Sequence, residues 1–403
     1  MDYPDGVSAA TVGVYVHVPF CERVCPYCDF AVVGVRTLTA EVERRYVDAL
    51  LRELELRRPA FAGRELASLY LGGGTPSLCR PESLARIVRA ARAAFEVRGP
   101  VEVTLEVNPS TLERERLPGF RDAGVNRLSL GIQSFDDATL KRLGRAHRGD
   151  EARLTLQAAR TAGFEALSCD LIFAAPDQGL PQLEADIDEL LAFAPEHVSA
   201  YELNVEPGTP FATAAERGQL ACAGEDEALA MWDAIESRLE AAAYVHYELS
   251  AYARPGFEAV HNQRYWRRQP VLGLGVGAFS TDPRGSRGDA PFGLRRSNLR
   301  SPDAYLARIE AGESAESEPA EALSPETARA EAMFLSLRTR SGLDAAAFER
   351  EFGRPPRGFY PDEITTLVAQ ALLAEDSAGG LRLTRRGQRL SDTVFANFVE
   401  LGD

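Results

Sequence analysis

The chain has 403 residues, with 45 lysines and arginines against 60 aspartates and glutamates, which gives a formal net charge of −15 at pH 7. Apolar residues make up 45% and charged residues 26%, the balance of a globular protein with a core domain and one or two smaller ones. Such an acidic chain argues against a nucleic-acid binder that works through bulk electrostatics. No apolar run reaches the ~18 residues that a membrane span needs, and MDYPDGVSAA does not read as a signal peptide. We therefore expect a cytoplasmic protein without a membrane span, though peripheral contact with a membrane stays open.

Short β-type runs alternate with helical patterns between residues 12 and 203. Helices are predicted to begin at Pro81 and near Ser134, and another covers 183–191. Six such alternations imply a parallel sheet with right-handed crossovers, either barrel-like or doubly wound. The predicted strands are 11–18, 69–71, 101–107, 128–130, 167–171 and 197–203.

The second half of the chain has a different pattern. A helix is predicted over 225–243, followed by ordered loops and short strands over about 250–300. The tail then predicts a helix between Ser324 and Gly342, a helix over 361–374, a short strand over 381–383 and a last helix from about Thr384. This order suggests a winged-helix-like domain. Its arginines at 382, 385, 386 and 389 would suit DNA, but the acidic chain favours a packing or lid role.

Three of the six cysteines, Cys21, Cys25 and Cys28, lie within eight residues at C-x3-C-x2-C spacing, directly after the first predicted strand. Thiolates are natural ligands of iron–sulfur clusters. Three ligands on a four-iron cube leave one iron open, and the amine and carboxylate of S-adenosylmethionine can chelate it. One electron from the cluster can then cleave the S–C5′ bond.

The alternative for these cysteines is a zinc site. Zinc requires a fourth ligand, and none stands at customary spacing, since Asp29 and His17 are the nearest candidates. The spacing therefore favours a [4Fe-4S] cluster.

Glycine-rich or polar segments follow several predicted strands, at the edge of a parallel barrel where ligands bind. Glycines let the backbone approach a ligand closely, carboxylates can accept ribose hydroxyls, and an arginine can pair with the methionine carboxylate. Each such residue alone is more often a capping or solvated one, but several at one barrel end make a joint case. They are Gly73, Gly74, Thr75, Glu106, Gln133, Arg145 and Asp170.

The cysteine motif after a first strand resembles the signature of the radical SAM superfamily. The flanking Y-x-H-x-P-F-C and Cys28-Asp29-Phe30 are similar to the branch that contains oxygen-independent coproporphyrinogen III oxidase and the HemW-like heme chaperones. In the oxidase a fourth cysteine follows the third after one residue, and here Phe30 stands at that position, which favours the HemW-like group. A second departure is Ala174-Ala175-Pro176-Asp177, where relatives usually have Gly-Leu-Pro-Gly, and it puts the shape of this loop in doubt.

The resemblance implies a partial (β/α)6 barrel of the TIM type, followed by a mainly helical, winged-helix-like C-terminal domain. The expected divisions are a core over 1–245, a basic and aromatic segment that completes it over 246–308, an acidic linker over 309–325 and the C-terminal domain over 326–403. The predicted residues for S-adenosylmethionine are Tyr15, Tyr27, Gly73, Gly74, Thr75, Glu106, Gln133, Arg145, Asp170 and Asn204.

A second motif is His261-Asn262-Gln263-Arg264-Tyr265-Trp266, in a segment with eight arginines and two acids between 261 and 300. Such a basic, aromatic segment suits an apolar ligand with carboxylates, such as a porphyrin. Histidine is a common axial ligand of heme iron, and Tyr265 and Trp266 could stack on the ring. The alternative is a packed core histidine. H-N-x-x-Y-W is similar to a motif of HemW-like proteins, and the resemblance implies heme binding at His261, Tyr265 and Trp266.

Two functions follow as expectations. The first is a heme chaperone that passes heme to apo-hemoproteins and uses the cluster, S-adenosylmethionine and an electron donor. The second is a radical enzyme that decarboxylates coproporphyrinogen or modifies heme. A zinc-stabilised DNA-binding protein fits the charge and the cysteine spacing poorly. No residue is predicted to be catalytic, and cleavage of S-adenosylmethionine in function stays open.

Overall fold

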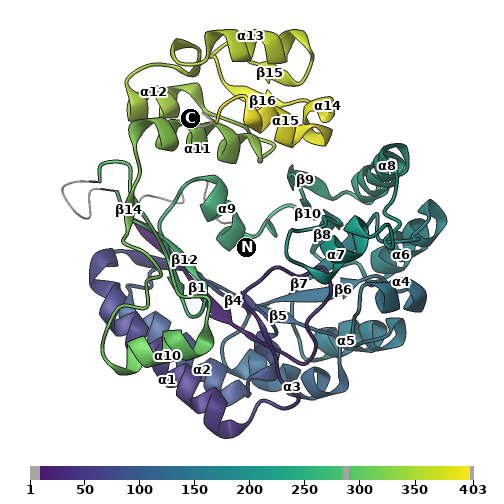
Figure 1. Ribbon diagram of the computed structural model, residues 1–403, viewed down its shortest axis with the longest axis vertical. Helices are drawn as coiled ribbons and strands as arrows, with labels where there is room; N and C mark the ends of the chain where they lie inside the picture. The colour runs from purple at the N-terminus through teal and green to yellow at the C-terminus, as the bar shows by residue number, and fades with distance from the viewer. Residues whose placement is uncertain (1–9, 285–289, 400–403) are drawn as a thin grey trace.

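A computed structural model describes residues 10–284 and 290–399 (Figure 1). The opening MDYPDGVSA and the basic-segment residues Arg287 and Asp289 lie outside the described residues. The main feature is a curved sheet of twelve strands in the order β14-β13-β12-β11-β1-β4-β5-β6-β7-β8-β10-β9. None of the helices in the described ranges has the length and apolar character needed to cross a membrane.

Six strands at the centre of the sheet run parallel in chain order. They are β1 (Thr11–Val18), β4 (Glu65–Gly73), β5 (Glu102–Val107), β6 (Arg127–Gln133), β7 (Ala166–Phe173) and β8 (His197–Glu202). The predicted partial barrel is thereby confirmed; β4, β6 and β7 are longer than the sequence pattern indicated, and β1, β5 and β8 agree with it to within one residue.

Helices connect these strands and form the outer layer of the curved sheet in Figure 1. Helix α2 shows why: Pro81 stands at its first position, and Leu84, Ile87, Val88 and Ala91 are buried on one face. The helices are α1 (Ala40–Arg57), α2 (Pro81–Ala94), α3 (Thr111–Asp122), α4 (Asp137–Arg142), α5 (Gly149–Thr161), α6 (Leu180–Phe193), α7 (Pro210–Glu216) and α8 (Glu225–Ala241).

The segment after residue 244 is more regular than the predicted loops and short strands. Strand β11 (Val271–Leu274) pairs parallel with β1 and adds a seventh parallel strand. Beyond it β12 (Phe279–Asp282), β13 (Leu294–Ser297) and β14 (Glu321–Ala322) continue antiparallel. At the other edge stand β10 (Ala251–Ala253) and β9 (Val245–Glu248). Helix α9 (Val260–Trp266) packs against β4, and α10 (Pro302–Glu310) packs against α1.

Two features hold this extension in place. Buried Glu53 of α1 accepts hydrogen bonds from Gly275 N, Asn298 Nδ2 and Tyr305 Oη at 2.8, 2.6 and 2.7 Å. In the stretch 309–325, expected to be a linker, β14 pairs with β13 and Glu316 forms an ion pair with Arg296. The stretch therefore connects two parts of the chain while it is itself fixed to the sheet.

The C-terminal domain, yellow at the top of Figure 1, has its own apolar core. The helix predicted over 361–374 is too long: it ends at Ala369 because Ala371 adopts a left-handed φ of 55° and a strand begins at Leu373. Helix α12 was not predicted. The elements are α11 (Pro325–Leu337), α12 (Ala345–Phe352), α13 (Pro361–Ala369), β15 (Leu373–Glu375), β16 (Leu381–Leu383), α14 (Arg385–Arg389) and α15 (Ser391–Ala396).

Arginines of α14 attach this domain to the barrel. Arg385 pairs with Glu236 and Glu240 of α8 at 3.1 and 3.2 Å, and Arg389 contacts Asp233 and Glu236. Acids of α8 therefore pair with these two arginines where the C-terminal domain meets the barrel.

Candidate cofactor site inside the barrel

A cavity of about 430 Å³ opens inside the barrel and brings most of the predicted site together. All three motif cysteines line it. So do nine of the ten residues predicted for S-adenosylmethionine, namely Tyr27, Gly73, Gly74, Thr75, Glu106, Gln133, Arg145, Asp170 and Asn204. Segments from residues 21 to 204 therefore converge on one space.

Tyr15 is the exception among the predicted residues. Its hydroxyl lies 3.1 Å from His17 Nδ1, and its ring stacks on Tyr70 with a centroid distance of 6.1 Å. Tyr70 lines the cavity and Tyr15 does not. Tyr15 therefore supports the wall from behind.

The cysteine loop follows β1 and the short strand β2 (Phe20–Cys21), which pairs with β3 (Val33–Gly34). Thr75 Oγ1 donates to Cys21 Sγ at 3.7 Å, and Arg145 Nη1 donates to Cys25 Sγ at 3.5 Å. Burial raises the pKa of Cys21 to about 11 and also raises the pKa of Cys28. Thiolates at these positions therefore need a bound cationic group to stabilise them.

The spacing of the thiols bears on the kind of metal group. In the part of the chain that the structure describes, no three His, Cys, Asp or Glu side chains lie close enough to hold one metal ion. The three thiols nevertheless line one cavity. In a [4Fe-4S] cluster each cysteine binds a different iron, so the three sulfur atoms lie farther apart than the ligands of a single metal ion. The three thiols of this cavity therefore fit a [4Fe-4S] cluster.

The glycine turn after β4 passes directly beneath the cysteine loop. Gly73 has a φ of +107°, and a Cβ there would lie 2.6 Å from the ring of His17. A Cβ on Gly74 would lie 2.8 Å from Phe20 O and 2.9 Å from Cys21 Sγ. Only glycine fits at these two positions.

Two half-buried carboxyl groups face the cavity. Glu106 accepts from Tyr70 Oη at 2.8 Å and from Gly73 N at 3.0 Å, and burial raises its pKa to about 7. Asp170 accepts from Ser129 Oγ at 3.1 Å, and burial raises its pKa to about 6. Near neutral pH, a donor group or a positive charge on a ligand would favour the ionised form of both.

Several buried polar atoms of the cavity wall have no hydrogen-bond partner among the residues described. They are Thr104 Oγ1, Arg127 Nη2, Gln133 Oε1 and Arg145 Nε. Gln133 also has a left-handed φ of 65°, where the pairing of β6 with β7 changes register. Buried polar groups are normally paired, so these atoms indicate a cavity built for a polar ligand.

Sequence reasoning missed many wall residues, although a signal was present. Along the parallel strands the inward positions are polar at every second residue, and the alternate positions, such as Val103, Leu105 and Leu128, are buried and apolar. A strand covered on both faces is usually apolar throughout, so this alternation marks a polar lumen. The missed lining residues are Tyr70, Thr104, Arg127, Ser129, Ser168, His197, Ser199, Tyr201, Glu206 and Asn262.

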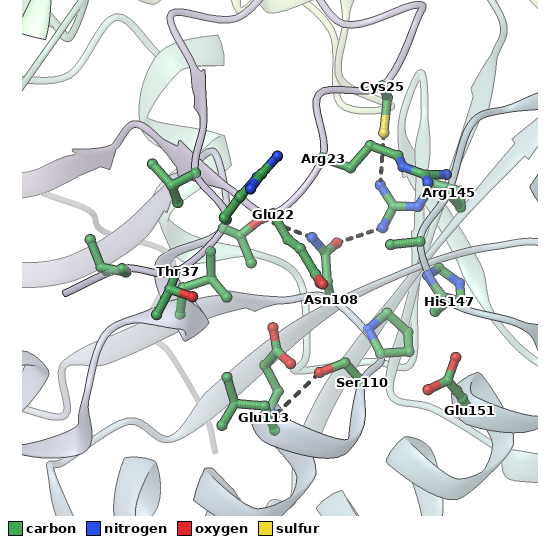
Figure 2. Close-up of a pocket in the computed structure, with 18 of the residues that line it drawn as sticks. Glu22, Arg23, Cys25, Thr37, Asn108, Ser110, Glu113, Arg145, His147 and Glu151 are labelled. Carbon is green, nitrogen blue, oxygen red and sulfur yellow. Dashed lines mark hydrogen bonds between the residues drawn. The ribbon is translucent and has the colours of Figure 1, made fainter.

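A second cavity of about 420 Å³ adjoins the first one, and five residues line both: Arg23, Cys25, Thr75, Asn108 and Arg145. Figure 2 shows the Arg145 guanidinium between Cys25 Sγ and Asn108 Oδ1. Arg145 therefore lies at the boundary of the two cavities. On the far side Glu113 is buried, and burial raises its pKa to about 7.

The second motif, on α9, contributes Asn262 to the wall of the barrel cavity, but His261, Tyr265 and Trp266 do not line that cavity. His261 is 1% exposed, and its ring nitrogens Nδ1 and Nε2 lie 2.9 Å from Ser68 Oγ and 3.1 Å from Tyr265 Oη. Trp266 stacks with Arg338 of the C-terminal domain at 4.4 Å. Ligation of heme iron by His261 would require these contacts to break. The geometry matches the packed histidine weighed as the alternative.

The loop that departs from its relatives keeps a glycine-like backbone. Ala174 and Asp177, which stand where glycine is usual, have φ values of 56° and 55°. Both residues therefore hold a left-handed conformation that non-glycine residues adopt at a cost.

The comparisons with known proteins agree with this geometry. The Radical SAM superfamily matches residues 15–190, and the HemN C-terminal domain matches residues 323–390. The heme chaperone HemW of Lactococcus lactis is 34% identical, with 96% of each chain covered. HemW of Bacillus subtilis is 32% identical over 96% of this chain and 98% of its own.

One solved structure extends the likeness to the whole fold. Coproporphyrinogen III oxidase (HemN) from Escherichia coli, a radical SAM enzyme, superposes with a TM-score of 0.80 and 23% identity, over 96% of this chain and 90% of its own. The predicted barrel and C-terminal domain are thus present in a solved relative. From the convergent cysteines, the barrel and these relatives, the chain belongs to the HemW family of radical SAM proteins.

Proposed function

We propose that this protein is a heme chaperone, which binds heme and passes it to apo-hemoproteins. The observation that carries the proposal is the whole-length similarity to relatives named heme chaperone HemW. Superfamily membership implies a [4Fe-4S] cluster and S-adenosylmethionine. When bound, this pair supplies one-electron reductive cleavage of the sulfonium, and a separate protein donates the electron.

The roles of the residues follow from their positions. Cys21, Cys25 and Cys28 hold the cluster, and the turn at Gly73 and Gly74 presents backbone groups beside it. Arg145 orients the Cys25 thiolate and offers the methionine carboxylate a cation. The other predicted lining residues complete the site for S-adenosylmethionine.

The carboxyl groups and the polar atoms without hydrogen-bond partners suit the adenosine part of S-adenosylmethionine. Glu106 and Asp170 accept hydrogen bonds from the ribose hydroxyls, and Gln133 Oε1 and Thr104 Oγ1 supply further polar atoms that lack partners. Tyr15 acts through Tyr70, since it lies behind the wall.

Metal analysis under strictly anaerobic conditions tests the cluster. The reconstituted protein should contain about four irons and four sulfides per chain and change its spectrum when S-adenosylmethionine is added. Cys25→Ala should lose both properties, and Cys222→Ala, an exposed cysteine outside the cavity, should keep them. Zinc in place of iron would contradict the proposal.

Heme transfer tests the chaperone role. The protein should bind about one heme per chain and deliver it to an apo-hemoprotein faster than free heme equilibrates. Turnover of coproporphyrinogen with S-adenosylmethionine and a reductant is the competing outcome. Phe30, 62% exposed at the position of the oxidase's fourth cysteine, argues against that turnover.

A further inference from the structure

A third cavity lies between strands β12 and β13 of the sheet and helix α11 of the C-terminal domain. It has a volume of about 530 Å³ and shares no lining residue with the barrel cavity. Its walls come from the segment before β4, the end of α9, strands β12 and β13, and α11 of the C-terminal domain. This volume is within the usual range for small-molecule sites. We call it the arginine pocket.

Five arginines line the arginine pocket, in a protein whose net charge is −15. Three of them are ion-paired: Arg268 and Arg284 with Glu351, and Arg295 with Glu331. The other two, Arg64 and Arg267, have no ion pair with any residue that the structure describes, and Arg64 Nη1 is buried without a hydrogen-bond partner. The lining therefore carries cations available to an anionic ligand.

Aromatic side chains supply the other half of the surface. Phe279 is 57% exposed, and Phe292, Phe334 and Tyr265 stand half-buried around the same space. Large exposed apolar groups beside free arginines match a ligand that has a flat apolar body and carboxylates at its edge.

Iron ligands are missing from the described lining: none of these residues is His, Cys or Met. The Tyr265 hydroxyl is bonded to His261 Nε2. The ligand would therefore be recognised by its ring faces and carboxylates, whatever metal the ring holds.

We propose that the arginine pocket binds the porphyrin cargo, a proposal that rests on the proposed heme chaperone function. Arg64 and Arg267 bind the porphyrin's propionates, and the protein provides no axial ligand to its metal. The basic segment seen in the sequence contributes through Arg267, Arg268, Arg284 and Arg295. His261 contributes only by holding Tyr265 in the wall.

Titration of tryptophan fluorescence with hemin and with metal-free protoporphyrin IX, using the full reconstituted chain, tests this assignment. The two ligands should bind with dissociation constants within about fivefold of each other. The double variant Arg64→Ala/Arg267→Ala should weaken both at least tenfold, as lost charge-assisted hydrogen bonds predict. Arg92→Ala, an exposed arginine of α2, is the matched control.

Phe279→Ser is a second variant, since it removes ring contact at an exposed position, and it should also weaken both ligands. Strong preference for hemin over protoporphyrin, or selective loss of hemin in His261→Ala with no effect of the arginine changes, would overturn the pocket assignment while leaving heme binding intact. Wild-type protein that binds neither ligand would overturn the proposed function itself.

Discussion

The titration of Glu106 should govern the affinity for S-adenosylmethionine. Burial, with a contribution from the nearby Asp170 charge, raises the pKa of Glu106 to about 7. Its two oxygens already accept from Tyr70 Oη and Gly73 N, and protonation replaces one acceptor site with an O–H donor, so the ionised form is the much better acceptor for a ligand hydroxyl. Affinity should therefore be full above pH 7 and fall as pH decreases through that value.

The size of the effect follows from the pKa. Each pH unit below the pKa reduces the ionised fraction tenfold, which is about 1.4 kcal/mol, so Glu106 alone predicts about a 30-fold loss between pH 8 and pH 5.5. Asp170, with a pKa of about 6, adds to the loss at the acid end. Glu106→Gln should bind about 10-fold or more weakly at pH 8, as expected for a lost charge-assisted hydrogen bond, and its affinity should change less with pH.

Anaerobic equilibrium dialysis with labelled S-adenosylmethionine measures these affinities, while cluster absorbance at each pH verifies that the iron stays bound. Asp186→Asn is the matched control, because burial raises the pKa of Asp186 to about 6 but its partners, Ser134 and the Phe135 amide, lie outside the cavity. A pH profile that is flat in wild type, or equally steep in Glu106→Gln, would refute the reasoning.

Two further predictions concern stability. Glu53→Ala leaves three buried donors of the sheet extension without an acceptor, so the free energy of unfolding in urea should decrease by about 3 kcal/mol or more. Glu53→Gln should decrease it less. A decrease below about 1 kcal/mol in Glu53→Ala would mean that the hydrogen-bond network rearranges at little cost. Arg389→Ala removes the contacts with Asp233 and Glu236 that attach the C-terminal domain to α8. Amide exchange in α8 and α14 should accelerate, whereas the exposed Arg386→Ala should leave it unchanged, and equal rates in both variants would argue against this docking contact.

Much of the fold could be predicted because it depends on short-range patterns. Strand β1 reads as alternating apolar residues, α2 shows helical spacing after Pro81, and the three cysteines lie within one loop. The carboxyl ends of parallel strands meet at one edge of a sheet. This rule predicts that Glu106, Asp170 and the glycine turn lie close together, and in the structure all of them line one cavity.

What could not be predicted depends on contacts between residues far apart in the chain. The sequence does not say which way the short helix α9 faces, so it leaves His261 open as a heme ligand or as a packed core histidine. The contact with Ser68, 193 residues away, is visible only in the fold. Similarly, the basic segment looked uniformly available, but Arg268 and Arg284 pair with Glu351 of the C-terminal domain. Only the assembled fold separates paired arginines from free ones.

The polar lumen makes a last prediction, because a cavity that binds a polar cofactor should weaken the cofactor-free fold. Thr104 is 2% exposed and its Oγ1 has no partner among the described residues. Thr104→Val keeps the shape and removes the unpaired hydroxyl, so it should stabilise the cofactor-free protein by about 1 kcal/mol and weaken S-adenosylmethionine binding. Thr155→Val is the control: Thr155 is equally buried but donates to Glu151 O at 2.7 Å, so its replacement should destabilise the protein. Urea unfolding of both variants measures these changes in stability. A loss of stability in Thr104→Val as large as that in Thr155→Val would mean that the polar groups of the lumen are hydrogen-bonded like those of an ordinary core.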